Sequence, residues 1–237
     1  MFNNFDLIPV IDLLGGQVVH AQRGEREKYK PLNSILTDSA SPVSIARLLL
    51  KKTKSNTLYV ADLDAIQKRL PQKNAILNIA SVLIGTEFWL DGGFATFENF
   101  THLINSGKKL PNVCPVFSSE SLLSLESAIE SLEIFPESIL SLDKKNNTFL
   151  NDSQICDYPK FWPKRIILMN LDKVGSENGP DIEWILKMKS ENPSIKIYGA
   201  GGIRNNGDVL RVLKAGASGW LCASALHLGL IDYDKNG

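Results

Sequence analysis

One stretch of this chain occurs twice, and this repetition constrains the fold more than any other feature of the sequence. Residues 88–107 read FWLDGGFATFENFTHLINSG and residues 197–216 read IYGAGGIRNNGDVLRVLKAG. A shift of 109 positions superposes Gly92 on Gly201, Gly93 on Gly202 and Gly107 on Gly216. Each copy is an apolar run, a glycine pair and a segment of helical periodicity. This pattern is typical of a β-strand that leads through a glycine turn into an amphipathic helix.

Glycine turns of this kind suit anions. Without a Cβ atom, the backbone N–H groups of the turn approach an anion closely, and the start of the following helix adds partial positive charge. A single such turn can equally serve backbone geometry alone. Because the turn recurs at a fixed offset in the two halves of the chain, we interpret the copies as two phosphate sites.

Apolar runs recur along the whole chain, with helical patterns between them. They are continuous rather than alternating, as expected for parallel strands buried on both faces. The runs are residues 7–11, 57–61, 87–90, 113–117, 138–142, 165–169, 195–199 and 218–222. Eight such strands in 237 residues predict one α/β domain, a (β/α)8 TIM barrel with half-barrels of about 1–118 and 119–237. A doubly wound open sheet is the alternative.

The helices expected between these strands are residues 41–52, 97–106, 119–133, 181–191 and 206–215. Ser41 is the expected N-cap of the first, with Pro42 at the first helical position. The charged segment from Gly15 to about Asp38 is long, and in a barrel it would overhang the active face like a lid.

Composition limits the partners. Hydrophobic residues make up 43% of the chain, charged residues 22%, and the formal net charge is zero, which argues against nucleic acid as a partner and favours a small molecule. The three cysteines show no paired spacing, so we expect neither a disulfide framework nor a zinc site. The N-terminal sequence lacks a signal-peptide pattern and no long apolar run follows, which predicts a cytoplasmic protein without a membrane partner.

Acidic or amide side chains stand at or just after the ends of five expected strands. They are Asp12, Asp62, Asp64, Asp91, Asp143, Asn170 and Asp172. In a barrel these ends converge on the face that carries the active site. Asp12 and Asp143, on the first and fifth strands, would face each other across the mouth and suit acid and base roles. Each Asp alone is also compatible with a helix cap.

Other conspicuous side chains receive structural interpretations. His20 is expected to be a partly buried structural group, and His102 and His227 to lie at the surface. Trp89 and Trp220 are expected to serve packing. No cluster of His, Cys and Glu has ligand spacing, so neither a metal nor a cofactor is expected.

Several segments together resemble the histidine-biosynthesis barrel family. They are IPVIDLLGGQVVHAQRG, VADLDAI, LDGGF, LMNLDKVGSENGPD and IYGAGGI with a closing ASALHLG, between about residues 7 and 230. That family includes the phosphoribosylformimino-aminoimidazole carboxamide ribotide isomerase and the cyclase subunit of imidazole glycerol phosphate synthase. The resemblance implies a two-fold-repeated barrel that binds a small substrate with a phosphate at each end.

The resemblance also assigns roles to individual residues. Asp12 matches the family's first-strand aspartate, the general base of the isomerase, and Asp143 matches the fifth-strand aspartate. Gly92, Gly93, Gly201 and Gly202 match the phosphate-loop glycines. Ser118 and Ala223 stand where the family usually has a further glycine, and Ser119 and Ser224 beside them can still supply donors.

The loop after the sixth strand departs from the family. Val174 stands where the isomerase has an aspartate that serves as general acid, and valine has no proton to donate. Asp143, Asp172 or Ser176 would then have to take that role, with Gly175 among the substrate-binding residues. Ala95 also replaces an arginine that is common after the third-strand glycines.

Three functions are compatible with this pattern. The first is an Amadori rearrangement of a phosphoribosyl aminoaldose to an aminoketose. The second is a cyclase or lyase-like reaction on a related phosphorylated substrate, and the third is a phosphometabolite-binding barrel without catalysis. VADLDAI and GEREKYKPL resemble a divergent branch of the family associated with one-carbon, methanopterin-type metabolism.

Overall fold

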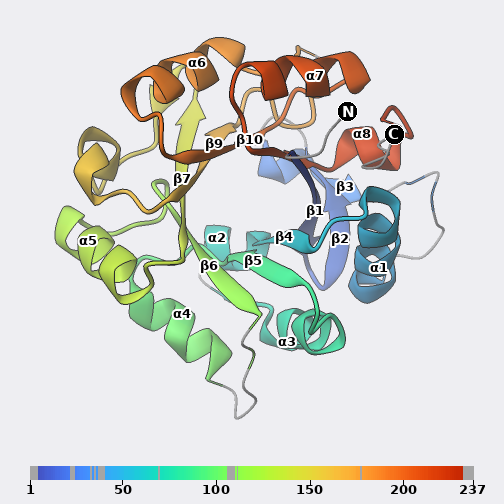
Figure 1. Cartoon of the computed structure of the whole chain (residues 1–237). Helices are drawn as coiled ribbons and strands as arrows, with labels where there is room; N and C mark the ends of the chain where they lie inside the picture. The colour runs from blue at the N-terminus through green and yellow to red at the C-terminus, as the bar shows by residue number, and fades with distance from the viewer. Residues whose placement is uncertain are drawn as a thin grey trace.

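A closed parallel barrel forms the centre of the molecule (Figure 1). The computed structural model describes residues 5–21, 25–32, 34, 36, 41–68, 70–105, 110, 112–176 and 178–231. Its parallel strands are β1 (Asp6–Leu14), β4 (Thr57–Asp62), β5 (Glu87–Asp91), β6 (Val113–Ser118), β7 (Ile139–Lys145), β9 (Arg165–Asn170), β10 (Lys196–Ala200) and β11 (Gly219–Cys222). They pair in chain order, and β11 pairs with β1 to close the barrel, so the (β/α)8 prediction is confirmed.

Helices surround this barrel on its outside (Figure 1). They are α1 (Pro42–Thr53), α3 (Lys73–Val82), α4 (Phe97–Ile104), α5 (Leu125–Ile134), α6 (Ile182–Glu191), α7 (Asn206–Lys214) and α8 (Ser224–His227), whereas α2 (Leu63–Lys68) lies at one end of the barrel. The predicted helices near 41, 97, 181 and 206 are confirmed, whereas α2 and α3 were not among the predicted helices. Gly107, the expected end of the first repeat, lies outside the described residues.

One predicted helix begins later than expected. The segment 119–133 was expected to be helical throughout, but α5 begins only at Leu125, after Ser124, whose side chain accepts a hydrogen bond from the backbone N–H of Ser127. The residues before it form a turn, since the backbone N–H of Leu122 bonds to the carbonyl of Ser118. Local capping and this turn therefore override the helical pattern.

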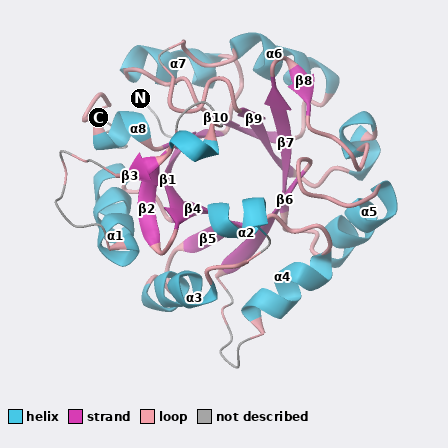
Figure 2. Cartoon of the chain, turned by 180° about the vertical axis from the view of Figure 1, so that it is seen from behind, coloured by secondary structure: helices cyan, strands magenta, loops and turns pink. Residues whose placement is uncertain are grey.

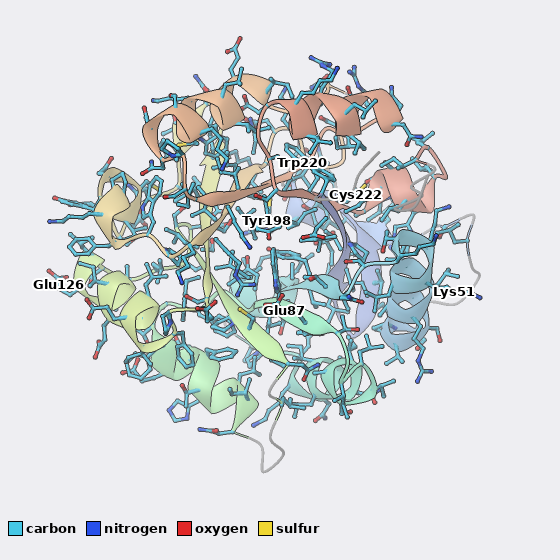
Figure 3. The ribbon with its side chains drawn as sticks, in the orientation of Figure 1. Lys51, Glu87, Glu126, Tyr198, Trp220 and Cys222 are labelled. Atoms are coloured by element: carbon cyan, nitrogen blue, oxygen red, sulfur yellow. The ribbon has the colours of Figure 1, made fainter. Side chains whose placement is uncertain are left out.

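The core has two layers. Inside the barrel, side chains such as Ile8, Trp89, Val116, Ile139 and Ile167 pack together. A larger cluster fills the space between the strands and the outer helices. Figure 3 shows Tyr198 within the ring, whereas Lys51 on α1 and Glu126 on α5 point away from it.

The end of the barrel where the strands lead into helices is partly covered. Strand β2 (Gln17–His20) pairs antiparallel with β1 and with β3 (Lys30–Pro31), and the short helix η1 (Arg26–Lys28) lies between them. Helix α2 lies across the opening from the side of β4 (Figure 2). On the far side of the barrel β8 (Thr148–Phe149) forms a hairpin with β7, followed by η2 (Ile155–Asp157) and η3 (Pro159–Phe161).

Each of the predicted halves supplies four barrel strands, namely β1, β4, β5 and β6 from residues 1–118 and β7, β9, β10 and β11 from residues 119–237. The proposal that the halves superpose by a two-fold operation stays a prediction. Among the described residues, no helix is long and apolar enough to cross a membrane.

Candidate active site

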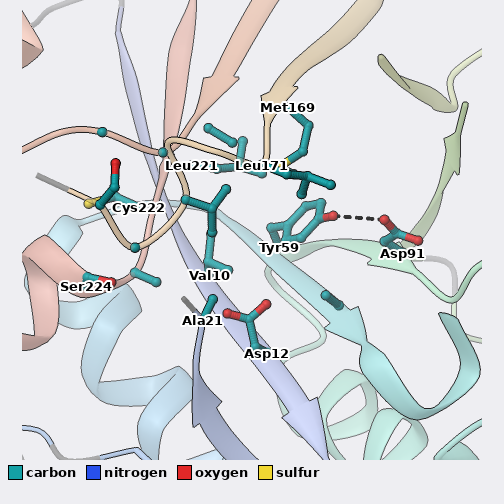
Figure 4. Close-up of a pocket in the computed structure, with 18 of the residues that line it drawn as sticks. Val10, Asp12, Ala21, Tyr59, Asp91, Met169, Leu171, Leu221, Cys222 and Ser224 are labelled. Atoms are coloured by element: carbon teal, nitrogen blue, oxygen red, sulfur yellow. Dashed lines mark hydrogen bonds between the residues drawn. The ribbon is translucent and has the colours of Figure 1, made fainter. Parts of the chain in front are cut away.

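A pocket opens at the end of the barrel where the strands lead into helices (Figure 4). Its floor is the uppermost layer of the barrel interior, made of Val10, Ala61, Met169, Ala200 and Leu221. Its walls carry the carboxyl groups of four residues, Asp12, Asp91, Glu120 and Asp143. Apolar surroundings and converging carboxyl groups are the features expected of an active site on this face.

Asp12 stands at the centre of this wall. It lies on β1, and Figure 4 shows it between Ser224 on one side of the pocket and Asp91 on the other. Burial of its carboxyl raises the pKa to about 7, against a smaller lowering by the positive charge of Arg26. A carboxyl group with a pKa near neutrality suits a general base, because it is free to accept a proton yet basic enough to hold it.

Asp91 ends β5 and is the second acidic group on the pocket wall. The Tyr59 hydroxyl on β4 donates to its Oδ2 at 3.0 Å, and the backbone N–H of Gly93 donates to its Oδ1 at 3.1 Å. Burial raises the pKa of Asp91 to about 7, and the nearby charge of Asp143 adds to the rise. The carboxyl is therefore held in place, and near pH 7 it is present in both its protonated and its ionised form.

Asp143, on β7, is held by donors from the neighbouring strand and loop. Its Oδ2 accepts hydrogen bonds from the hydroxyls of Ser118 at 2.6 Å and Ser119 at 3.1 Å, and from the backbone N–H of Glu120 at 3.3 Å. The Ser141 hydroxyl donates to Oδ1 at 2.8 Å. Burial raises the pKa of Asp143, and the serine hydrogen bonds oppose that rise. The carboxyl thus lines the pocket in one fixed orientation.

Arg26 covers the mouth from the segment between β2 and β3. Its guanidinium binds the Glu120 carboxylate through two hydrogen bonds, Nη1 to Oε1 at 2.7 Å and Nη2 to Oε2 at 2.8 Å. Both side chains are mostly buried, with exposed fractions of 21% and 25%. The expected lid over the active face is therefore present in part, because Ala21, Arg26 and Tyr29 line the pocket.

The second glycine unit, defined as Gly201 and Gly202 with Ala223 and Ser224, forms one side of the pocket. The predicted phosphate-binding residues that line it are Gly175, Gly201, Gly202, Ala223 and Ser224. Gly201 and Gly202 have φ angles of +82° and +80°, and a Cβ on Gly202 would lie 2.3 Å from the carbonyl oxygen of Gly179. Only glycine fits there, because the φ is left-handed and the loop backbones touch. The turn consequently presents backbone to the pocket.

The first glycine unit, defined as Gly92 and Gly93 with Ser118 and Ser119, does not line the pocket, although Asp91 directly before it does. Gly92, Gly93, Ser118 and Ser119 are all buried outside its lining. A Cβ on Gly92 would lie 2.6 Å from the ring of Phe94, which is packed edge-on against Phe100 in the core. The structure therefore brings one of the two predicted phosphate sites to the candidate active site and leaves the other beneath its surface.

The loop after β9 contributes unevenly. Val174 and Ser176 line the pocket, and the Ser176 hydroxyl donates to the carbonyl of Lys173 at 3.0 Å. Asp172 lies outside the lining, and its carboxylate accepts a hydrogen bond from the backbone N–H of Asn146 at 2.7 Å. The geometry thus gives no support to the prediction of Asp172 as a proton donor.

Two histidines lie close to the pocket rim. His20 Nε2 is 3.0 Å from the hydroxyl of Ser224, which is consistent with the structural interpretation of His20. The expectation of a surface position for His227 was wrong. The residue is 2% exposed, and its Nδ1 lies 3.0 Å from the Ser34 hydroxyl. Burial and the charge of His20 lower its pKa to about 4, so the ring stays neutral.

The described part of the pocket offers neither a reactive thiol nor a cluster of metal ligands. Cys222 lines the pocket, but burial raises the pKa of its thiol to about 12. In the described part of the chain, no three His, Cys, Asp or Glu side chains gather in an arrangement that would hold a metal ion.

Sequence reasoning omitted four polar residues from the predicted site, namely Arg26, Tyr59, Asp91 and Glu120. The position of Asp91 at a strand end was a usable signal. Tyr59 gave none, because it lies within a continuous apolar run. Glu120 did not stand out because it lies within the helix expected over 119–133. Arg26 did not stand out because it lies in a charged segment without periodicity.

Comparison with known proteins gives one family. Residues 6–232 match the family described as histidine biosynthesis protein. The chain is 28% identical over 236 residues to an uncharacterized protein of Methanocaldococcus jannaschii, covering 97% of this chain and 96% of that protein. Two relatives named as imidazole-4-carboxamide isomerases, with two phosphoribosyl groups in the substrate name, are similar over nearly their whole length. The one from Acetivibrio thermocellus is 24% identical over 239 residues, 95% of each chain, and the one from Thermoanaerobacter sp. is 26% identical over 243 residues, 96% of each.

Proposed function

Since the chain belongs to the histidine biosynthesis protein family, we propose that it is an isomerase-like enzyme that converts a phosphorylated aminoaldose into an aminoketose. The relatives named as isomerases cover nearly the whole chain and so support this reaction class. The observation that carries the proposal is the position of Asp12, with a pKa of about 7, in a pocket that is also lined by Asp143 from β7, on the opposite side of the barrel from β1.

The rearrangement needs an acid first. Protonation of the ring oxygen of the sugar breaks its bond to C1, and the nitrogen lone pair forms the C1–N double bond of a protonated Schiff base. Asp91 and Asp143 can supply this proton as a pair, since two neighbouring buried carboxylates repel each other when both are ionised. The pair therefore stands in for the acid that Val174 cannot provide.

The base acts next. The Asp12 carboxylate removes the proton from C2, and the electron pair moves through C1 to neutralise the nitrogen. The resulting enaminol becomes the aminoketose when C1 gains a proton and the C2 hydroxyl loses one. Asp12 can return its proton to the neighbouring C1, so no oxidant or reductant is consumed. A positioned acid or base of this kind contributes roughly 10²–10⁴ to the rate.

The substrate is held by its phosphate at the second glycine unit. The backbone of Gly201, Gly202, Ala223 and Ser224 lines that side of the pocket and supplies N–H donors without any acidic side chain among them. Ser176 and Gly175 complete the wall.

A cytoplasmic location, expected from the sequence, remains part of the proposal.

A cyclase or lyase-like reaction is the second candidate, because the one residue that the isomerase pattern requires and this chain lacks lies on the pocket wall. Val174 is apolar there, while Asp12 and Asp143 are both present. Such a reaction would use these two carboxyls without an acid at position 174.

A steady-state isomerase assay of the native protein with Val174→Asp and Asp143→Asn separates the candidates. We expect low native activity on the bis(phosphoribosyl) imidazole-4-carboxamide substrate of the relatives. If only the family acid is missing, Val174→Asp should raise that activity, by roughly 10²-fold. If the Asp91–Asp143 pair already supplies the proton, Val174→Asp should change little. Undiminished turnover in Asp143→Asn would remove Asp143 from the mechanism.

A further inference from the structure

The two glycine units arise from one sequence pattern but offer different groups to a ligand. Gly202, Ala223 and Ser224 line the pocket, and among the described residues none accepts a hydrogen bond from their backbone N–H groups. Three free N–H groups on a concave wall are well placed to bind the oxygens of one phosphate. The second unit is therefore complete as an anion site.

At the first unit, the corresponding donors already bind carboxylates of the protein. The Gly93 N–H donates to Asp91, while the Ser118 hydroxyl, the Ser119 hydroxyl and the Glu120 N–H all donate to Asp143 Oδ2. The Ser119 N–H donates to the carbonyl of Ser141 at 2.8 Å. Asp143 thus takes the place of an external anion at the first unit.

Space at the first unit is also filled. The Phe94 ring lies against the α-carbon of Gly92 and is 2% exposed, packed edge-on against Phe100 and Phe117. Its counterpart in the second unit, Ile203, lines the pocket. A phosphate at the first unit would have to displace a core aromatic ring as well as an internal carboxylate.

The negative charges near the first unit also disfavour a phosphate there. Asp91, Glu120 and Asp143 gather at this end of the pocket, since the charges of the latter two both raise the pKa of Asp91. Among the described residues that line the pocket, Arg26 is the one cation, and Glu120 already binds it through both oxygens. A second phosphate would meet like charges without a free counter-charge.

We infer, building on the proposed function, that the substrate carries a single phosphate, bound at Gly202, Ala223 and Ser224, with a neutral hydrogen-bond donor or an ammonium group at its other end. That end lies against Asp91, Glu120 and Asp143. The substrate is then a phosphorylated sugar with an amino group at or near the reacting carbon, rather than a compound with a phosphate at each end.

Three ketose ligands that differ at one end test this inference. Ribulose 5-phosphate has one phosphate, 1-amino-1-deoxyribulose 5-phosphate adds an ammonium group, and ribulose 1,5-bisphosphate adds a second phosphate. In calorimetric titrations at pH 8 and low salt, we expect the amino ligand to bind most tightly. The bisphosphate should bind at least roughly tenfold more weakly than ribulose 5-phosphate.

The variant Asp91→Asn removes one charge from the acidic end. It should reduce the difference in affinity between the bisphosphate and ribulose 5-phosphate. Glu130→Gln, a matched change on the exposed face of α5, should leave that difference in affinity unchanged. Native protein that binds the bisphosphate as tightly as ribulose 5-phosphate, or that binds none of the three, would overturn the inference. Ribulose 5-phosphate binding in the expected order without aminoaldose turnover would instead contradict only the proposed reaction.

Discussion

The first and second glycine units share a sequence pattern, yet one is closed by its own side chains and the other faces the pocket. At the first unit, Asp143 accepts the hydrogen bonds of Ser118 and Ser119, and Phe94 fills the space beside Gly92. At the second unit, Gly201 and Gly202 line the pocket. A repeated motif therefore predicts a repeated backbone, while the residues around it decide whether it binds an anion.

The same comparison separates binding from chemistry. The proposed anion site lies on the second half of the chain, whereas the acidic end of the pocket combines Asp91 of the first half with Glu120 and Asp143. Asp12 lies between the two in Figure 4. A substrate bound by its phosphate at one unit would place its reacting carbons near Asp12 and its amine at the other unit.

The largest expected effect is that of Asp12→Asn. Removing the base should lower kcat by roughly 10²–10⁴ on any aminoaldose substrate the enzyme accepts, because asparagine cannot take the C2 proton. Phosphate affinity should stay within a factor of about two, since Asp12 is not part of the second glycine unit, and the unfolding temperature should be unchanged or higher. In the native enzyme, kcat/KM should rise as the pH passes through about 7, where Asp12 loses its proton.

A different outcome for Asp12→Asn would contradict the assignment of Asp12 as the base. If Asp12→Asn kept its turnover while its unfolding temperature fell by many degrees, Asp12 would be a structural cap and the base would have to be sought elsewhere.

The paired variants Gly202→Ala and Gly92→Ala compare the two units directly. A methyl group at Gly202 forces a φ of +80° on alanine and meets the carbonyl of Gly179, so the turn must move. Inorganic phosphate affinity, followed by calorimetry, should fall roughly 100-fold, because each hydrogen bond to a charged group is worth about 1.5–3 kcal/mol.

Gly92→Ala should destabilise the fold through its contact with Phe94 and leave phosphate affinity nearly unchanged. Circular dichroism before each titration confirms that both variants are folded. Equal losses of phosphate affinity in the two variants would mean that the first unit also binds an anion.

The smallest effect concerns stability at the acidic end. The pKa of Asp91 is about 7 in the folded protein, against 3.8 for an unburied aspartate, so folding takes up a proton between these values. Stability from this group is therefore lost as the pH rises from about 4 to 7, and ionised Asp91 destabilises the fold above that range.

Asp91→Asn should remove this loss of folding stability with rising pH, because asparagine does not ionise. By denaturant unfolding, the variant's advantage over the native protein should be larger at pH 8 than at pH 5 by roughly 2 kcal/mol. Glu130→Gln serves as the control on the exposed face of α5 and should show no such difference. An advantage that did not grow with pH would indicate that Asp91 remains ionised and well solvated in the folded protein.

The fold was readable from the sequence because continuous apolar runs mark buried parallel strands at every step of the chain. Two of the departures from the predicted helices, the late start of α5 and the unpredicted α3, have local causes. Helix α5 starts late because Ser124 caps it, and α3 lies in a stretch where Pro71 and Gln72 hide its start.

The site was less readable. Asp12, Asp143 and Ser176, which were singled out by their positions at or after strand ends, line the pocket, and their catalytic roles stay predictions. The hydrogen bonds by which Asp143 closes the first unit could not be predicted, because a sequence does not show the partners of a hydrogen bond. Glu120 and Arg26 form their ion pair across 94 positions of the chain for the same reason.

The most direct test of the difference between the two units is a crystal of the native protein soaked in phosphate. We predict one anion per chain, bound by the backbone N–H groups of Gly202, Ala223 and Ser224, with Asp143 still bonded to Ser118 and Ser119. A second anion beside Gly92, Gly93, Ser118 and Ser119, with Asp143 displaced from the serine hydroxyls, would contradict the account.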